Sequence, residues 1–248
     1  MEHNKNNPKA IMLICIGMTV FALQDTFIKL ISSNTNIYLI YFVRCLVGML
    51  VTIVYLKYNK IPIVYKTHYP LLTIARTICF FVGFSLYYFS LSKLSLPLAV
   101  TLFFVSPFFV TIFSMLIMNE KIGLRRWIAI SVGFLGVYLV MDPKFDNFNI
   151  YTLFPVICAI CYAFTVIIQK KTSDKDSLFS QILHIYLSAI IFSIIIKITL
   201  SNINFNSSTI NEYNFILMNW KISDSFSFLL LLLIGLTGVI GFFCLFRA

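Results

Sequence analysis

The sequence predicts an all-α membrane protein with eight transmembrane helices, and three observations predict it. The 248 residues are 60% hydrophobic and only 11% charged, whereas soluble domains are about 25% charged. The hydrophobic residues form runs of about 20, which at 1.5 Å per residue cross a hydrocarbon layer of about 30 Å. Short segments between the runs hold most of the Lys and Arg residues. A nucleic-acid-binding protein with this net charge of +10 would gather them on one face, so we expect no nucleic acid partner.

The eight spans follow one another with short connections. We place them at residues 10–31, 38–57, 70–91, 97–118, 125–141, 151–169, 179–200 and 226–246. Lys5 and Lys9 precede the first span as in a signal peptide, but its apolar run is too long and no cleavage site of small residues follows, so we expect a retained span. The long Asn- and Ser-rich connection 201–225 is predicted to be solvated, with a short interfacial segment at 215–220 as the alternative.

The distribution of Lys and Arg predicts the orientation. With the N-terminus inside, the inner segments hold twelve of these residues: Lys5, Lys9, Lys57, Lys60, Lys66, Lys121, Arg125, Arg126, Lys170, Lys171, Lys175 and Arg247. The outer segments hold five: Lys29, Lys93, Lys144, Lys197 and Lys221. Because Lys and Arg are enriched on the cytoplasmic side of membrane proteins, we expect both termini in the cytoplasm.

A weak internal similarity relates the two parts of the chain. Gly83-Phe84 in the third span resembles Gly241-Phe242 in the eighth, and Phe21-Ala22 in the first resembles Tyr162-Ala163 in the sixth. A repeat unit of five spans places its second copy inverted in the membrane, as in many secondary transporters. This predicts a complete first repeat of five spans over residues 1–143. An incomplete, inverted second repeat of three spans follows over residues 150–248.

Several short motifs carry a family resemblance. They are Leu98-Ala99 leading to Ser106-Pro107, Asn119-Glu120-Lys121 at the end of the fourth span, Gly133-Phe134-Leu135-Gly136-Val137 in the fifth, and Arg44 in the second. In these residues the chain resembles the EamA family of the drug/metabolite transporter superfamily, and most closely its alphaproteobacterial members that take up metabolites such as riboflavin or S-adenosylmethionine. The resemblance is strong over residues 38–143.

The resemblance implies ten helices in two inverted repeats, both termini in the cytoplasm, a bacterial inner-membrane location and a central substrate cavity. This chain lacks the ninth and tenth spans. We therefore expect it to be a fragment of such a protein. The alternative is that it completes its bundle with another chain.

Two charges near the outer ends of the first two spans predict an ion pair. A charge at the centre of a membrane helix costs about 2.5–3.5 kcal/mol on insertion scales, so it needs a partner or a water-lined cavity. Asp25 and Arg44 lie at similar depth in antiparallel spans. We hypothesise that they pair inside the bundle near an outer gate. The alternative pairs Asp25 with Lys29, one helical turn on, and the sequence does not decide between them.

Other charges lie near the cytoplasmic ends of the spans. Arg76 is a candidate for binding an anionic group of the substrate, with a snorkelling side chain that sets topology as the slightly favoured alternative. Glu120 closes the fourth span beside Lys121, Arg125 and Arg126. We expect these four residues to form a structural ion cluster at the inner surface, in preference to a proton-coupling carboxylate.

The fourth span contains a proline near its middle. Pro107 cannot donate a hydrogen bond to the carbonyl of Phe103, so we expect a kink there, with Ser106-Pro107 as a candidate lining of the cavity. Tyr87 and Tyr88 of the third span, together with Phe103 and Phe104 of the fourth, are candidates for stacking on a flat or cationic substrate. The alternative for these aromatic residues is ordinary helix packing.

These features predict a secondary transporter that moves a small organic metabolite by alternating access, and not an enzyme. No G-x-x-x-x-G-K-[ST] motif is present, so we expect a gradient to drive transport without a cofactor. The C-x-x-C of Cys158 and Cys161 has no second pair and no nearby His, so we expect no metal.

Two other functions are left as alternatives. An intramembrane enzyme or flippase acting on lipid would need clustered acids and bases at one depth, but only three His are present, and the lone His184 is more typical of a satisfied polar group than of a proton relay. The other is a partner subunit that does not itself transport. The sequence leaves open whether two copies form a homodimer among the membrane lipids.

Overall fold

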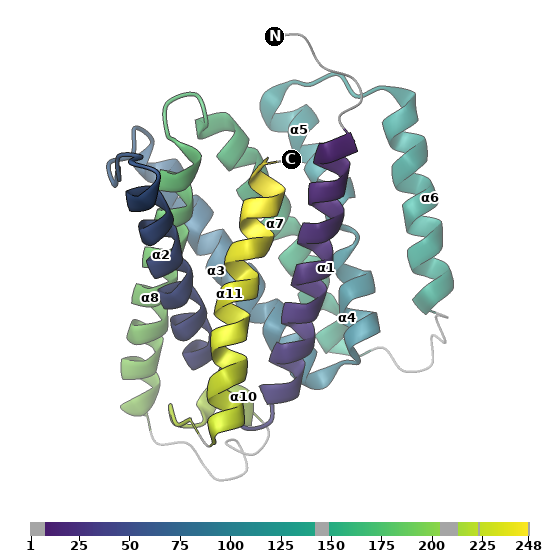
Figure 1. Cartoon of the computed structure of the whole chain (residues 1–248). Coiled ribbons are helices and arrows are strands. Elements are labelled where there is room, and N and C mark those ends of the chain that lie inside the picture. Colours follow the sequence, from purple (N-terminus) through teal and green to yellow (C-terminus); the bar gives the residue numbers. More distant parts are fainter. Residues whose placement is uncertain (1–7, 142–148, 204–212, 223, 248) are drawn as a thin grey trace. The chain divides into compact units, whose positions relative to one another are not determined.

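Every regular element in the described part of the chain is a helix (Figure 1). The computed structural model describes residues 8–141, 149–203, 213–222 and 224–247. In order, the elements are α1 (Pro8–Ile31), α2 (Ile37–Tyr58), α3 (Pro70–Lys93), α4 (Leu96–Phe103), α5 (Ser106–Met118), α6 (Leu124–Met141), the 3-10 turn η2 (Ile150–Thr152), α7 (Leu153–Thr172), α8 (Leu178–Ser201), α10 (Asn214–Leu217) and α11 (Ser225–Arg247). The predicted all-α class is confirmed.

Seven stretches of the described residues are long and apolar enough to cross a membrane. They are Met12–Ile31, Ile37–Tyr58, Pro70–Lys93, Leu96–Met118, Ile150–Thr172, Leu178–Ser201 and Ser225–Leu245. Each coincides with a predicted span. The remaining predicted span, 125–141, forms helix α6, which is not among the seven. The membrane-spanning architecture therefore agrees with the prediction, and the number of eight spans stays a prediction.

Proline and asparagine mark several helix ends. Pro70 and Pro97 lie in the first turns of α3 and α4, where an amide has no helical partner and the fixed φ of proline suits the helix. The side chain of Asn36 caps α2 by accepting a hydrogen bond of 2.8 Å from the amide of Tyr38. Asn119 ends α5 in the left-handed conformation, with φ of 54°. These local signals fix where the hydrophobic runs begin and end.

The fourth predicted span consists of two helices. Helix α4 ends at Phe103 and α5 begins at Ser106. Between them the amide of Val105 donates to the carbonyl three residues back, at 3.4 Å, and that of Phe108 does so at 3.1 Å. Because Pro107 has no amide hydrogen for the carbonyl of Phe103, the α-helical pattern stops here. The predicted kink is thus present as a break just before Pro107.

The chain forms two compact units, each with helices from both predicted repeats. Unit 1 comprises Met1–Ile63 and Ser193–Ala248, unit 2 comprises Val64–Phe192, and α8 runs from one into the other. In unit 1, α11 packs along α1 and α2. In unit 2, α7 packs along α3 and α5. The predicted repeat boundaries, 1–143 and 150–248, extend beyond the described residues and stay a prediction.

A glycine brings α3 and α7 close together in unit 2. A Cβ atom on Gly83 would lie 2.7 Å from the Cβ atom of Cys161, closer than real Cβ atoms approach. The next residue, Phe84, meets Tyr162 edge to face, with centroids 6.3 Å apart and ring planes at 87°. The absent side chain of Gly83 therefore allows the two aromatic rings to meet.

The same kind of contact occurs in unit 1 between α11 and α1. A Cβ atom on Gly241 would lie 2.8 Å from the ring of Phe21. The next residue, Phe242, meets Phe21 edge to face, with centroids 5.7 Å apart and ring planes at 83°. In each unit a Gly-Phe pair thus packs against an aromatic residue of a partner helix.

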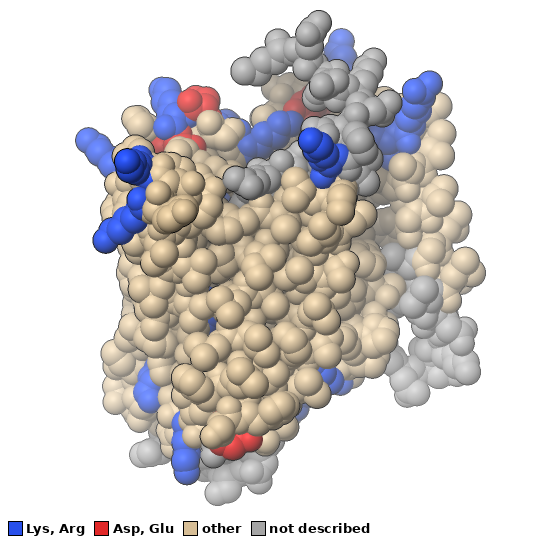
Figure 2. Space-filling model, viewed as in Figure 1, with Lys and Arg blue, Asp and Glu red and all other residues tan. Residues whose placement is uncertain are grey.

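The face of unit 1 seen in Figure 2 carries few charged side chains along its helices. Over α1, α2 and α11 most of the visible Lys and Arg lie toward the helix ends. Large apolar side chains such as Met12, Leu50 and Val54 are exposed on these sides. A surface of this kind suits contact with lipid chains, where a charged side chain is costly.

Candidate functional site

An aromatic cluster lies between α3, α4 and α7 of unit 2. Phe84, Tyr87 and Tyr88 share one face of α3, because residues three and four apart are neighbours on a helix. Phe103 is the last residue of α4. The centroid of its ring lies 5.4 Å from the ring centroid of Tyr87, 6.2 Å from that of Phe84 and 5.5 Å from that of Tyr162. Three of the four predicted aromatic candidates, Tyr87, Tyr88 and Phe103, therefore lie together, joined by Phe84 and Tyr162. The fourth, Phe104, is exposed.

The cluster offers ring faces to a ligand. Phe84, Phe103 and Tyr162 are half-buried, whereas Tyr87 and Tyr88 are buried behind them. Rings at mixed angles take a flat molecule by offset or edge-to-face stacking, and a cation over a ring face. Sequence analysis missed Phe84 and Tyr162, although Phe84 lies one helical turn before the predicted tyrosines.

The break between α4 and α5 positions Phe103 in this cluster. Helix α4 packs against α7 and α6, and α5 packs against α7. Ser106 at the start of α5 is buried, whereas Pro107 is exposed. Of the two residues predicted to line a cavity, only Ser106 turns its side chain into the interior of unit 2.

Arg76 of α3 is directed to α8 and not to the surface. Its side chain is 1% exposed. The guanidinium group donates to the side-chain oxygen of Gln181 and, at 2.9 Å, to its backbone oxygen. The amide group of Gln181 in turn donates to the backbone oxygen of Asp176 at 3.0 Å. The snorkelling alternative therefore does not describe Arg76, whose partner Gln181 was not predicted.

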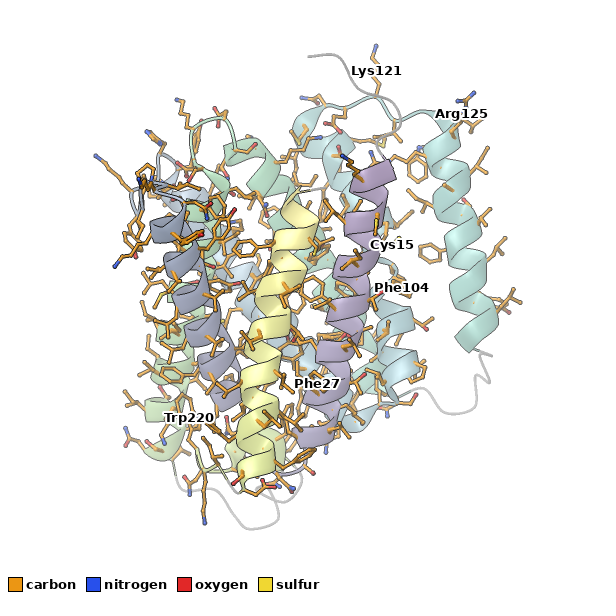
Figure 3. All side chains as sticks on the ribbon, viewed as in Figure 1. Cys15, Phe27, Phe104, Lys121, Arg125 and Trp220 are labelled. Atoms are coloured by element: carbon orange, nitrogen blue, oxygen red, sulfur yellow. The ribbon has the colours of Figure 1, made fainter. Side chains whose placement is uncertain are left out.

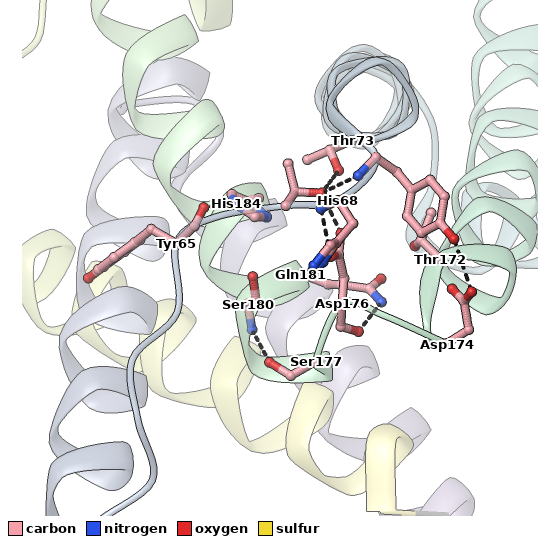
Figure 4. A network of polar contacts seen from close by, with 12 residues as sticks. Tyr65, His68, Thr73, Thr172, Asp174, Asp176, Ser177, Ser180, Gln181 and His184 are labelled. Carbon is pink, nitrogen blue, oxygen red and sulfur yellow. Dashed lines mark hydrogen bonds and ion pairs between the residues drawn. The ribbon is translucent and has the colours of Figure 1, made fainter.

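A polar network ties the segment before α3 to the turn between α7 and α8 (Figure 4). The carboxylate of Asp176 accepts hydrogen bonds from the hydroxyl of Thr67, from the amide of His68 at 2.9 Å and from its ring Nδ1 at 3.0 Å. Burial raises the pKa of Asp176, but these hydrogen bonds lower it by more, so it lies below its ordinary value. The hydroxyl of Tyr69 donates to Asp174 at 2.9 Å, which raises the pKa of Tyr69.

Glu120 forms an ion pair with Lys170. Its carboxylate accepts hydrogen bonds from Lys170 of α7 and from the hydroxyl of Ser114 of α5. These two bonds hold the pKa of Glu120 below its ordinary value. The left-handed Asn119 turns the chain back, so that the amide of Glu120 also donates to the backbone oxygen of Ser114 at 3.3 Å.

The predicted cluster at Glu120 gathers only in part. Lys121, Arg125 and Arg126 are exposed, and Figure 3 shows Lys121 and Arg125 extending away from the ribbon. Lys170 is the ion-pair partner, 50 residues further along the chain. Sequence analysis missed it because only the packing of α5 on α7 brings the two residues together.

In unit 1, three helices meet at Gly238. A Cβ atom there would lie 3.0 Å from Oε1 of Gln24 and 3.1 Å from Nε of Arg44. Arg44 and Gln24 are buried, and Asp25 is half-buried. The α11 backbone at Gly238 therefore lies directly beside the predicted Arg44. The pairing of Asp25 with Arg44, or with Lys29, stays a prediction.

A polar hollow of about 350 Å³, which includes its open mouth, lies at one end of unit 1. The ammonium group of Lys197 lies 5.2 Å from the ring centroid of Trp220, and the side chain of Asn36 donates to two backbone oxygens of the segment around α10, each at 2.7 Å. The lining residues are Asn36, Tyr38, Lys197, Leu200, Ser201, Ile216, Leu217, Met218, Asn219 and Trp220. Sequence analysis pointed only to the segment 215–220 as a short interfacial element.

The cysteines of the C-x-x-C motif serve helix packing. Cys158 and Cys161 face Gly83 across the contact between α7 and α3. Among the residues that the structure describes, no group of three His, Cys, Asp or Glu side chains is placed to hold a metal ion.

Known proteins resemble this chain over much of its length. An S-adenosylmethionine uptake transporter of Rickettsia bellii is 32% identical over 130 residues, which are 52% of this chain and 44% of that protein. One of Rickettsia conorii is 28% identical over 183 residues, 74% of this chain and 56% of that protein. A riboflavin transporter of Vibrio cholerae is 33% identical over 99 residues, 40% of this chain and 33% of that protein.

These matches cover about half or less of the relatives' own length. Residues 8–142, which are more than half of the chain, match the sequence pattern of the EamA-like transporter family. The match includes α1 to α6 and therefore the predicted motifs around Ser106, Glu120 and Gly133. The chain belongs to the EamA-like transporter family.

Proposed function

We propose that this protein is a secondary transporter that moves a small, flat organic metabolite across the bacterial inner membrane by alternating access. The observation that carries the proposal is the aromatic cluster of Phe84, Tyr87, Tyr88, Phe103 and Tyr162 inside a membrane-spanning unit. The relatives named above are called transporters of S-adenosylmethionine and of riboflavin. Both molecules carry a flat heteroaromatic ring, which suits such a cluster.

The same observations weigh against the alternatives. A lipid-modifying enzyme needs acids and bases at one depth, and in the described part of the chain the carboxylates of Glu120 and Asp176 lie at helix ends, already engaged by Lys170 and by Thr67 and His68. A flippase needs a path for a lipid headgroup. An aromatic cluster is better suited to a soluble metabolite with a flat ring.

The contacts within unit 2 support the proposed orientation. The pairs Glu120–Lys170 and Thr67–Asp176 bring the segment before α3 and the turns after α5 and α7 to one end of this unit. This basic end holds Lys66, Lys121, Arg125, Arg126, Lys170, Lys171 and Lys175. By the positive-inside bias it faces the cytoplasm. Lys5 and Lys144, which entered the same prediction, lie outside the described residues.

The two Gly-Phe contacts support an inverted repeat of five spans. Gly83-Phe84 packs on Tyr162, and Gly241-Phe242 packs on Phe21, in nearly the same edge-to-face geometry. The first of these contacts joins the third span to the sixth, and the second joins the eighth span to the first. A repeat that relates the first span to the sixth and the third to the eighth therefore relates one contact to the other. The proposed architecture therefore has eight spans, with α6 as the fifth, and the second repeat begins near residue 150.

Uptake by the full chain in proteoliposomes tests the proposed function. We expect saturable uptake of radiolabelled S-adenosylmethionine or riboflavin. Phe103→Ala and Tyr162→Ala should weaken it by about 5- to 150-fold, because stacking on one aromatic side chain contributes about 1–3 kcal/mol. Phe226→Ala, on an exposed position of α11, is the matched control and should leave uptake unchanged. Folded protein that takes up neither compound, or that moves fluorescent lipid between leaflets, contradicts the proposal.

A further inference from the structure

Arg76 is a buried positive charge held only by neutral groups. Both of its hydrogen-bond acceptors belong to Gln181, an uncharged residue. Of the described carboxylates, none lies within ion-pair distance of Arg76. Asp176 is the carboxylate that acts on it electrostatically, but its oxygens are occupied by Thr67 and His68. A buried cation without a counter-ion is costly, so its position calls for a compensating anion.

Buried hydrogen-bonding atoms without a described partner occur on Arg76 and on α8, the helix that holds Arg76 through Gln181. Nε of Arg76, Oγ of Ser180 and Nδ1 of His184 are buried and have no hydrogen-bond partner among the residues that the structure describes. His184 donates through Nε2 to the backbone oxygen of Tyr65 at 2.7 Å, so its Nδ1 carries a lone pair. Ser180 and His184 are four residues apart on α8 and share a face, next to Gln181, which holds Arg76. Buried polar atoms are normally satisfied, so Nε of Arg76 and the hydroxyl of Ser180 are donors available to a polar ligand, whereas Nδ1 of His184 can only accept.

Arg76 also shares a face of α3 with the aromatic cluster. Arg76, Phe80, Phe84 and Tyr87 follow the spacing of one helix face. The rings of Phe80 and Phe84 are in contact, with centroids 4.6 Å apart. Eight residues separate Arg76 from Phe84, which corresponds to about 12 Å along the helix. An extended metabolite with a ring at one end and a charged group at the other has this length.

We infer that Arg76 anchors a carboxylate of the transported molecule, whose flat ring stacks on the cluster of Phe84, Phe103 and Tyr162. Nε of Arg76 and the hydroxyl of Ser180 donate to the carboxylate, and Gln181 holds the guanidinium group in place. This inference rests on the proposed function and narrows its substrate class to flat-ring carboxylates. It favours a compound such as S-adenosylmethionine, which carries a carboxylate, over riboflavin, which does not.

Thermal unfolding of the full chain in nanodiscs tests the anchor independently of transport. The probes are millimolar 8-phenyloctanoate and its uncharged amide, which have the same ring and chain and are long enough to reach from Phe84 to Arg76. For the wild type we expect the carboxylate to raise the melting temperature by roughly 2–5 °C more than the amide does. Arg76→Gln should abolish this difference, and Arg76→Lys should keep part of it. Arg126→Gln removes the same charge at an exposed position and should retain the full difference.

Two results overturn the anchor. One is an equal shift by carboxylate and amide in the wild type, which needs no variant and therefore holds even where Arg76→Gln fails to fold. The other is a carboxylate-specific shift that persists in Arg76→Gln. A carboxylate-specific shift that depends on Arg76, found without uptake of any metabolite, keeps the anchor and refutes transport. Uptake that does not distinguish a carboxylate substrate from its amide keeps transport and refutes the anchor.

Discussion

Phe84 and Tyr162 meet edge to face across α3 and α7, with their ring centroids 6.3 Å apart. The contact exists because Gly83, the residue before Phe84, has no side chain where α7 passes. Packing and the candidate site therefore depend on the same glycine.

A methyl group at Gly83 should loosen this contact. In Gly83→Ala the new Cβ atom would lie 2.7 Å from that of Cys161, so α3 and α7 must separate. We expect a loss of about 1–3 kcal/mol in the free energy of unfolding, and weaker substrate binding. Chemical unfolding of the purified protein measures the first effect.

The chain offers a rescue and a control for this change. Cys161→Gly in the same chain removes the opposing Cβ atom and should restore part of the stability. Gly136→Ala places its Cβ atom where no other atom lies within 4 Å, so α6 should tolerate it. Equal losses in Gly83→Ala and Gly136→Ala would show that helix contact is not the cause.

Asp176→Asn should destabilise the protein in a pH-dependent way. The folded pKa of Asp176 lies below its ordinary value of 3.8. The carboxylate therefore stabilises the fold above about pH 4, and this contribution is lost as the pH falls through the lower folded value. We expect about 1–3 kcal/mol at neutral pH, because a buried charged acceptor loses its hydrogen bonds. Melting temperatures measured from pH 7 to pH 3 should converge for wild type and variant.

Asp174→Asn is the matched control for Asp176. Asp174 is exposed and accepts one hydrogen bond, from Tyr69. Its replacement should change the melting temperature much less. If the two variants lose equal stability, the buried hydrogen bonds of Asp176 are not the source of its effect.

Glu120→Gln should cost little stability. The pair with Lys170 is largely solvated, and exposed ion pairs contribute little. We expect the melting temperature to fall by no more than about 3 °C. The folded pKa of Glu120 is lowered, so this difference is present at neutral pH and vanishes as the pH falls below the ordinary glutamate range near 4.

Lys170→Gln should reproduce the effect of Glu120→Gln, and the double variant should add nothing further. Lys171→Gln alters the neighbouring exposed lysine and should have no effect. Additive losses from the two single variants would contradict the pairing.

Charge exchange tests the predicted pair in unit 1. Asp25→Arg or Arg44→Asp alone should abolish folding, because each leaves like charges close together in an apolar surrounding. The double exchange should restore folded protein, measured as monodisperse protein after extraction. Exchange between Asp25 and Lys29 is the comparison. If only that exchange restores folding, the pair with Lys29 is the correct one.

Sequence reasoning located the helices well, since runs of about 20 apolar residues are a strong signal. Seven predicted spans coincide with helices that can cross a membrane, and Pro107 marks the break in the fourth. The pattern of the third and fourth spans predicts Tyr87, Tyr88, Phe103 and Phe104 as candidates. The first three lie together, whereas Phe104 is exposed.

The partners of these residues could not be predicted from local pattern. Gln181 and Lys170 contact Arg76 and Glu120 across 105 and 50 residues, and both contacts depend on how α7 and α8 pack. Phe84 and Tyr162 are two aromatic residues among 26 Phe and 13 Tyr. Their local sequence does not distinguish them from the other aromatic residues. The contact of Gly83 with α7, which brings their rings together, does.

The interruption at Phe104 and Val105 divides the fourth span into two rigid rods with a joint between them. Helix α4 ends in Phe103, at the aromatic rings, and α5 ends beside Glu120 and Lys170. Because the helical hydrogen bonds are interrupted between them, a displacement of α5 at its Glu120 end need not be passed on to the rings at the end of α4.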